Sequence, residues 1–153
     1  MKLGNLIIAA CLAFSVSNAY ALSGKVVRVL DGDTLIILTK DKEQVRIRLK
    51  EIDAPEKKQA FGKKSKNALI QMCAGKNAEI RVPELDRYKR TLGHVYCDGL
   101  YVNKELVKLG LAWVYRRYSK DPSMIVEETK SKTAKRGLWA DSNPTPPWEY
   151  RRR

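Results

Sequence analysis

The chain has 153 residues, of which 30 are Lys or Arg and 17 are Asp or Glu, so its formal net charge is +13. No linker, low-complexity tract or internal repeat interrupts the sequence, which excludes a repeat array and favours one domain with its own core. The excess of cationic side chains favours polyanionic partners, because Lys and Arg neutralise phosphates and release counterions. Nucleic acid is therefore the first partner class to consider, and anionic surfaces are the second.

Residues 1–21 have the pattern of a secretory signal peptide. Lys2 supplies the positive start, residues 6–16 are mostly apolar, and residues 19–21 form a small-x-small cleavage site. The apolar stretch is shorter than the ~20 residues that span a bilayer, which argues against a transmembrane anchor. Lipid attachment at Cys11 is a weaker alternative. We expect a secreted or periplasmic protein that begins at Leu22 and has no stable membrane association after cleavage.

Five segments have the composition of β-strands. Residues 25–30 and 34–39 come first, separated by the turn-prone triplet Asp31-Gly32-Asp33. In the run "QVRIRLKEID", residues 44–53, apolar and cationic side chains alternate, which predicts a half-buried strand with a cationic outer face. Residues 79–82 and 92–97 form the last two predicted strands.

Three segments are expected to be helical. Residues 63–74 place apolar side chains on one face and end at Gly75. Asn103 can cap a short helix that runs to residue 112, and Asp121-Pro122 opens a longer helix that ends near Gly137. A helix between the third and fourth of five short strands predicts an α+β fold, a small Greek-key barrel with terminal helices. Barrels of this type commonly bind oligonucleotides on one face.

The mature chain keeps two cysteines, Cys73 and Cys97. Neither has a second Cys or His at metal-ligand spacing, so a disulfide is favoured over a metal or catalytic site, with two buried thiols as the alternative. A loop of this length would gain about 3 kcal/mol from the bond in the chain-entropy model. His94, the only histidine, alternates within a strand and is interpreted as structural.

The segment "RLKEIDAPE" collects acidic and basic side chains more tightly than the rest of the chain. Arg48, Asp53 and Glu56 lie at or near the end of the third strand, where they can meet the Asp31-Gly32-Asp33 loop at the barrel rim. Carboxylates brought together repel unless a cation lies between them, and hard oxygen ligands favour Ca²⁺ or Mg²⁺. An EF-hand is excluded because the third ligand position is Leu35. On pattern alone, the triplet can also be an ordinary turn and the arginines a solvated face.

The chain resembles the staphylococcal nuclease (thermonuclease) family from about residue 24 to residue 139. The resemblance rests on five motifs in the family's order: "VVRVLDGDTL", "VRIRLKEIDAPE", "DRYKRTLGHVYCDG", "VNKELVKLGLAWVY" and "AKRGLW". It implies a five-stranded OB-fold barrel with three α-helices over residues 22–140, followed by a Pro-rich basic tail over residues 141–153. It also implies sugar-nonspecific, Ca²⁺-dependent endo- and exonucleolytic cleavage of DNA and RNA that leaves 3′-phosphate ends.

The resemblance also assigns roles to residues. It implies that Asp33, Asp53 and the backbone carbonyl of Ala54 hold the Ca²⁺, and that Glu56 is the general base or orients the attacking water. Arg48 and Arg90 would stabilise the phosphorane, since guanidinium groups suit planar phosphate contacts and keep their charge at neutral pH.

Further motif positions concern substrate binding. The resemblance implies that Arg87 and Tyr88 approach a terminal phosphate and that Tyr118 lines the nucleotide pocket. A second pocket tyrosine of the family is replaced by Arg116, a threonine common in the family is Ala54, and the loop over residues 56–62 is shorter. The expected partners are DNA and RNA, single-stranded or locally melted, bound by a monomer.

Two alternatives remain open at this point. A noncatalytic OB-fold module could bind single-stranded nucleic acid through the basic face and three tyrosines, Tyr88, Tyr115 and Tyr118. The tail "PTPPWEYRRR" could dock a partner. The simpler interpretation is that it packs on the domain and contacts nucleic acid. Its prolines, at positions 144, 146 and 147, are expected to prevent regular helix.

Overall fold

The computed structural model describes residues 22–153. The predicted signal peptide and the possible lipid-attachment residue Cys11 lie outside the described residues. Within residues 22–153, each helix is too short or too polar to cross a membrane.

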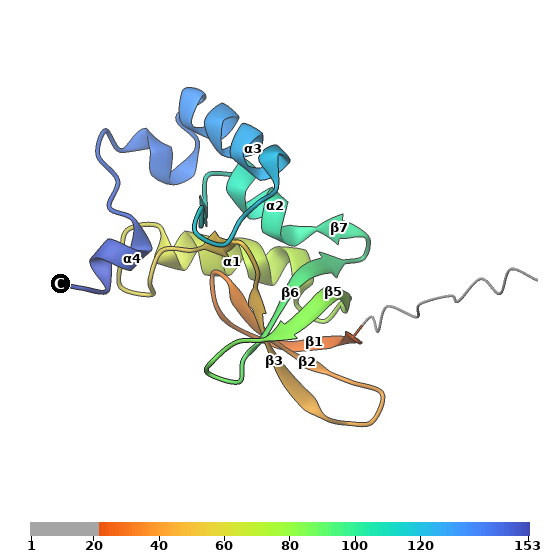
Figure 1. The fold of residues 1–153 in the computed structure, drawn as a ribbon. Coiled ribbons are helices and arrows are strands. Elements are labelled where there is room, and N and C mark those ends of the chain that lie inside the picture. The colour runs from red at the N-terminus through yellow and green to blue at the C-terminus, as the bar shows by residue number, and fades with distance from the viewer. Residues whose placement is uncertain (1–21) are drawn as a thin grey trace, which may run out of the picture.

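Five strands close into a mixed barrel, as predicted (Figure 1). Antiparallel pairs join β1 to β2, β2 to β3, β1 to β5 and β5 to β6, and a parallel pair between β3 and β6 closes the barrel. The five strands are β1 (Leu22–Asp31), β2 (Thr34–Leu38), β3 (Gln44–Leu49), β5 (Asn77–Leu85) and β6 (Thr91–Cys97). The strand predicted over residues 44–53 is interrupted after Leu49, where Glu51 has a φ of 67°, and its last two residues form the short strand β4 (Ile52–Asp53). β4 pairs beside the barrel with β8 (Trp113–Val114), a short strand that the sequence did not reveal. A third, β7 (Leu100–Tyr101), extends the sheet at β6.

The helices are α1 (Gly62–Cys73), α2 (Val102–Lys108), α3 (Pro122–Thr133) and α4 (Pro147–Tyr150), with the 3₁₀ turn η1 (Gly137–Ala140) after α3. The first three were predicted, although α2 ends at Lys108 and not at residue 112, and α3 ends at Thr133, before the expected boundary near Gly137. Asp121 caps α3 by accepting a hydrogen bond from the Ser123 N–H at 2.8 Å, as expected. The expectation of no helix in the tail was wrong. Pro147 lies in the first turn of α4, where its missing N–H breaks no intrahelical bond.

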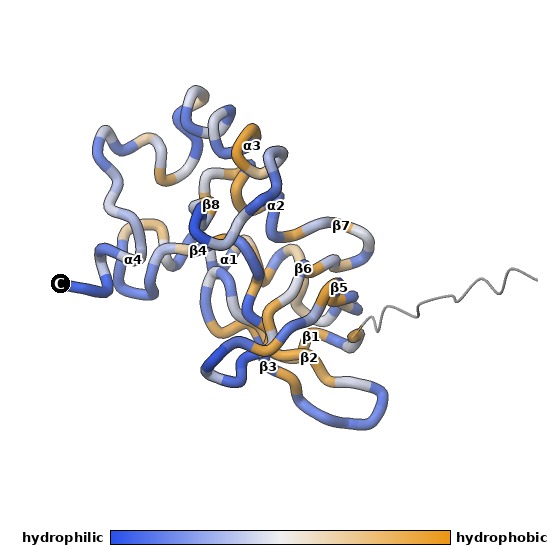
Figure 2. Tube along the Cα trace, in the orientation of Figure 1, coloured by the Kyte–Doolittle hydropathy of each residue, from blue (hydrophilic) through white to orange (hydrophobic). Residues whose placement is uncertain are grey.

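The core lies inside the barrel and continues between the barrel and the helices (Figure 2). The alternation predicted for β3 is present, since Ile47 and Leu49 are both fully buried. Helix α1 contributes Leu69 and Cys73 to the same core, and α2 contributes Leu106. The helices therefore close one side of the barrel and fix the loops that connect the strands there.

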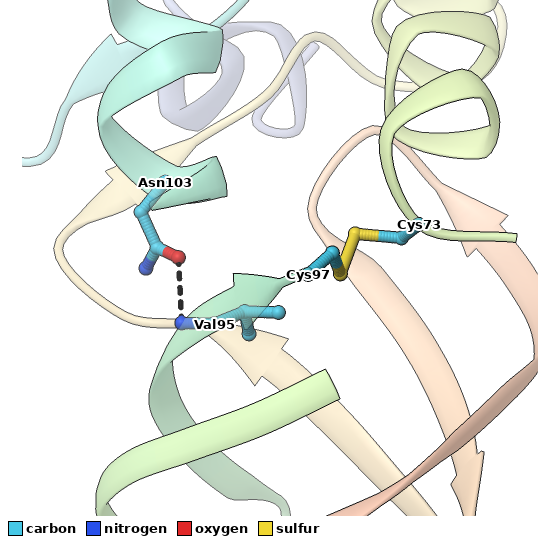
Figure 3. The surroundings of a disulfide bond; sticks show 4 residues. All are labelled: Cys73, Val95, Cys97 and Asn103. Carbon is cyan, nitrogen blue, oxygen red and sulfur yellow. Dashed lines mark hydrogen bonds between the residues drawn. A yellow bond between two sulfur atoms is a disulfide. The ribbon is translucent and has the colours of Figure 1, made fainter. Parts of the chain in front are cut away.

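A disulfide and a buried amide connect the helices to β6 (Figure 3). Cys73 at the end of α1 bonds to Cys97 at the end of β6, with their Cα atoms 5.4 Å apart. The amide oxygen of Asn103 accepts the Val95 N–H at 3.0 Å, and its nitrogen donates to the Lys50 carbonyl at 2.9 Å and the Gly93 carbonyl at 3.3 Å. The predicted capping role of Asn103 was wrong. The helix begins after Tyr101, and the Asn103 side chain turns into the barrel instead.

His94 lies on β6, where its Nδ1 is 2.7 Å from the Tyr101 hydroxyl. Burial lowers the pKa of His94 below its usual value. The contact is made within the sheet, which agrees with a structural role.

Candidate functional site

The Asp31-Gly32-Asp33 triplet forms the tight connection between β1 and β2, and its two acids have different surroundings. The Asp31 carboxylate accepts the N–H of Asp33 at 3.1 Å and so shapes the turn. The Asp33 carboxylate is buried and accepts the Ala54 N–H at 2.7 Å and the Thr34 hydroxyl at 3.1 Å. The turn thus directs one carboxylate inward, toward the segment that follows β3.

Gly32 is required between the two acids for reasons of space. A Cβ atom at this position would lie 2.6 Å from the Cβ of Ser65 on α1 and 2.8 Å from the Cβ of Ala54. The loop is therefore packed directly against α1 and the candidate metal-binding segment. A larger residue would push the Asp33 carboxylate away from them.

Arg48 joins the two carboxylates that the sequence predicted to converge. Its Nη2 is 3.1 Å from an oxygen of Asp33 and 3.1 Å from an oxygen of Asp53. Its Nη1 donates to the Leu49 carbonyl at 2.7 Å and the Ile52 carbonyl at 3.0 Å, which fixes the guanidinium plane. The Arg48 side chain is only 14% exposed, so it belongs to the site and not to a solvated face.

Burial destabilises the ionised form of two carboxylates in this region, Asp31 and Asp53. The Asp53 side chain is 2% exposed, and burial raises its pKa although Arg151 and Arg48 oppose the shift. Burial also raises the pKa of Asp31 to about 6, and repulsion from Asp33 adds to this effect. Carboxylates in such surroundings are stabilised in their ionised form by a nearby cation.

Arg151, in the C-terminal tail, is the residue of the site that sequence reasoning missed. Its Nη2 lies 2.7 Å from Oδ2 of Asp53, and its Nη1 lies 3.2 Å from Oδ1 of Asp53 and 2.6 Å from Oε1 of Glu56. The hydrogen bond to Asp53 is the largest of several causes that raise the pKa of Arg151. The sequence shows only three consecutive arginines at the chain end, with no signal that distinguishes Arg151 from its neighbours.

Packing of the tail explains how Arg151 reaches the site. Trp148 on α4 stacks on Tyr115 with ring centroids 5.3 Å apart and an interplanar angle of 4°, and it meets Trp113 edge-on at 5.5 Å. The Gln59 side chain donates to the Thr145 carbonyl at 2.6 Å. Helix α4 therefore lies beside the loop that joins β4 to α1 (Figure 1). The tail packs on the domain, as the simpler interpretation predicted.

The structure does not bring Arg90 to the carboxylates. Arg90 lies in the turn between β5 and β6, where its Nε is 2.8 Å from the Asp86 carboxylate. The same carboxylate accepts the backbone N–H groups of Tyr88 at 2.8 Å and Arg90 at 2.9 Å, so turn hydrogen bonds hold this arginine locally. Within residues 22–153, no hydrogen bond or ion pair joins Arg90 to Asp33, Asp53 or Glu56.

The predicted substrate contacts lie on exposed surface. Tyr88 is 64% exposed, and the guanidinium carbons of Arg87 and Arg90 lie 4.8 and 5.4 Å from its ring centroid. Tyr118 is 54% exposed and meets Tyr115 edge-on at 4.9 Å. These rings are accessible for stacking, whereas Arg116 is paired with the buried carboxylate of Glu128 at 2.6 Å.

The donor set fits a hard cation with few protein ligands. Among residues 22–153, there is no group of three or more His, Cys, Asp or Glu side chains that could hold a metal ion. Asp33 and Asp53 nevertheless lie on either side of one Arg48 nitrogen, and the Ala54 carbonyl belongs to the adjacent residue. Two carboxylates and a carbonyl provide oxygen ligands suited to Ca²⁺ or Mg²⁺, with water or phosphate completing the coordination.

Comparison with models of known protein families identifies the family of the chain. The family model described as staphylococcal nuclease homologue matches residues 46–141, a range that includes Arg48, Asp53 and Glu56. The chain belongs to the staphylococcal nuclease family. The β1–β2 turn precedes the matched range, so the match to the family model does not include Asp33.

Relatives extend the similarity over most of the chain. An uncharacterized endonuclease of Escherichia coli is 47% identical over 133 residues, which cover 86% of each protein. An uncharacterized endonuclease of Haemophilus influenzae is 46% identical, covering 84% of this chain and 72% of the relative. A probable staphylococcal-like nuclease of rice, Oryza sativa subsp. japonica, is 43% identical over 72% of this chain but only 33% of its own length. The domain thus also occurs as part of longer proteins.

Proposed function

We propose that this protein is a Ca²⁺-dependent nuclease that hydrolyses phosphodiester bonds in DNA and RNA and leaves 3′-phosphate ends. The observation that carries the proposal is the pair of buried carboxylates, Asp33 and Asp53, held on Arg48 with Glu56 at the edge of the site. The names of the relatives, endonuclease and staphylococcal-like nuclease, support the same reaction class.

Each residue of the site has a role that follows from its surroundings. The Asp33 and Asp53 carboxylates and the Ala54 carbonyl would hold the Ca²⁺, which when bound supplies Lewis-acid stabilisation. The Glu56 side chain is 39% exposed, so it can accept a proton from water that approaches from solvent. Arg48 is fixed by two carbonyls, so its guanidinium can stabilise the additional negative charge of the phosphorane.

The bonding changes in the proposed reaction are simple. The water oxygen bonds to phosphorus as Glu56 takes the water proton, and the bond from phosphorus to the 5′-oxygen breaks. The 5′-oxygen leaves with a proton taken from solvent water, and the phosphate remains on the 3′-oxygen. The 2′-position of the sugar plays no part in these steps, so we infer that cleavage is sugar-nonspecific, and we propose that it is both endo- and exonucleolytic.

Substrate contacts complete the proposal. Arg90 would turn from Asp86 toward the phosphate when substrate binds, because the pair is partly exposed and its rupture costs little. Arg87 and Tyr88 would contact a terminal phosphate, and Tyr118 would stack on a base. Exposed rings favour single-stranded or locally melted substrate. We further propose that the protein acts as a monomer in the periplasm or outside the cell.

Digestion of supercoiled plasmid and of RNA by the purified protein tests this function. We expect cleavage in Ca²⁺ and none after chelation. Glu56→Gln should lower the rate roughly 10²- to 10⁴-fold, because it removes the proton acceptor. Glu43→Gln, a matched change in the exposed turn before β3, should leave the rate unchanged. Equal rates for Glu56→Gln and wild type would remove Glu56 from the mechanism.

The second candidate is a noncatalytic module that binds single-stranded nucleic acid. The exposed rings of Tyr88 and Tyr118, together with the basic surface, favour this possibility. Salt-dependent binding of oligonucleotides without any cleavage in Ca²⁺ would support it and would contradict the nuclease.

A further inference from the structure

Arg151 uses the same carboxylate oxygens that the proposed cation would need. Its two terminal nitrogens contact both oxygens of Asp53, at 2.7 and 3.2 Å, and one oxygen of Glu56 at 2.6 Å. Arg48 also contacts Oδ1 of Asp53, at 3.1 Å. The most buried carboxylate of the site is therefore already paired with two guanidinium groups.

A guanidinium and a Ca²⁺ ion cannot share these positions. Ca²⁺ binds carboxylate oxygens at about 2.3–2.6 Å and takes six to eight ligands, whereas the Arg151 nitrogen lies 2.7 Å from Oδ2 of Asp53. Two positive charges at this distance also repel each other strongly in a partly buried site. Binding of the cation to Asp53 must therefore weaken binding of Arg151, and by linkage Arg151 must weaken binding of the cation by the same factor.

The tail keeps Arg151 close enough to compete. The bond from Gln59 to the Thr145 carbonyl anchors the tail just before α4, and the stack of Trp148 on Tyr115 anchors α4 itself. A tethered group has an effective local concentration in the millimolar range even on a flexible linker. The Arg151 side chain is 42% exposed, so it can swing into solvent when a stronger cation arrives.

We propose that Arg151 is a tethered competitor for the cation site, so that the C-terminal segment sets the Ca²⁺ concentration at which the site becomes competent. Without the cation, Arg151 neutralises Asp53 and pairs with one oxygen of Glu56. With the cation, Arg151 leaves, and Glu56 becomes free to accept a proton. The inference rests on the proposed function, because it assumes that the cation binds at Asp33 and Asp53.

Calorimetric titration of the mature chain with Ca²⁺ tests this inference without relying on activity. Arg151→Gln should bind Ca²⁺ about 5- to 100-fold more tightly than wild type, the usual range of coupling between two sites. The matched control is Arg152→Gln, which removes the same charge from the adjacent exposed residue and should change the affinity less than about twofold. The Ca²⁺ concentration for half-maximal cleavage should move with the affinity in each variant.

The outcomes separate this inference from the proposed function. If wild type binds Ca²⁺ and cleaves nucleic acid, but Arg151→Gln binds Ca²⁺ no more tightly than Arg152→Gln, the competitor role is wrong and the nuclease stands. Weaker binding by Arg151→Gln would also overturn the inference, since it would make Arg151 a support of the site. If neither wild type nor Arg151→Gln binds Ca²⁺, the proposed cation site itself is wrong.

Discussion

Replacement of Asn103 tests how the structure joins the helices to the barrel and the site. Its fully buried side chain makes three hydrogen bonds, to Val95, Lys50 and Gly93. Asn103→Ala leaves the buried Val95 N–H without a partner, at a cost of about 1–3 kcal/mol. The Gly93 carbonyl still accepts the Lys50 N–H at 2.9 Å, so it adds little, and the Lys50 carbonyl adds about 1 kcal/mol. We therefore expect a total loss of about 2–4 kcal/mol in the free energy of unfolding.

Asn103→Asp sharpens the test because it changes one atom. It keeps the acceptor for Val95 but turns an oxygen toward the carbonyls of Lys50 and Gly93, in a site with no solvent. It should destabilise the protein at pH 7 at least as much as Asn103→Ala. The control Asn77→Ala, at an exposed position of β5, should stay within about 0.5 kcal/mol.

Urea unfolding at pH 7, followed by tryptophan fluorescence, measures these differences. A loss below about 1 kcal/mol for Asn103→Ala would show that water or local rearrangement satisfies the Val95 N–H, and would refute the reasoning. An Asn103→Asp variant as stable as wild type would refute it equally.

Three further predictions concern the disulfide, the first loop and pH. Replacing Cys73 and Cys97 together by Ala should lower the free energy of unfolding by about 3 kcal/mol, measured by urea titration, and an unchanged midpoint would contradict the constraint. Gly32→Ala should weaken Ca²⁺ binding in calorimetry, because its Cβ would meet Ser65 at 2.6 Å; wild-type affinity would show that the loop yields without moving Asp33. His94 has a lowered pKa in the folded protein, so unfolding takes up a proton as pH falls below about 6.5, and stability should decline with acidification. His94→Gln should flatten this decline in thermal melts from pH 7 to 5, and an unchanged slope would assign it to other groups.

The barrel was predictable because its signals are local. Alternation in β3 identified Ile47 and Leu49 as core residues, and both are buried. The same alternation placed Arg48 on the outward face of the strand, but it did not predict that the Arg48 side chain is only 14% exposed. Arg48 bends back onto the carbonyls of Leu49 and Ile52, because the chain turns after β3 and leaves those acceptors within reach. The alternation of residues along a strand predicts on which face a side chain leaves the backbone, but it does not predict that a long side chain folds back to contact nearby carbonyls.

Contacts between distant residues were less predictable. Arg151 meets Asp53 across 98 positions of sequence, and its place depends on the packing of Trp148 against Tyr115. Asn103 has the residue type of a helix cap, but burial against Val95 decides its conformation. For Asn103, tertiary contacts override the local preference that the sequence displays, and for Arg151 they act where the sequence displays none.

The central claim is that Asp33 and Asp53 hold a cation that phosphodiester hydrolysis requires. The most direct measurement is the rate of plasmid cleavage by Asp53→Asn and wild type over a range of Ca²⁺ concentrations. The variant keeps the size of the side chain but removes its charge. The account therefore predicts that half-maximal cleavage needs a higher Ca²⁺ concentration and that the rate at saturation falls by about 100-fold or more. Cleavage by Asp53→Asn at the wild-type rate and the wild-type Ca²⁺ concentration would contradict the account.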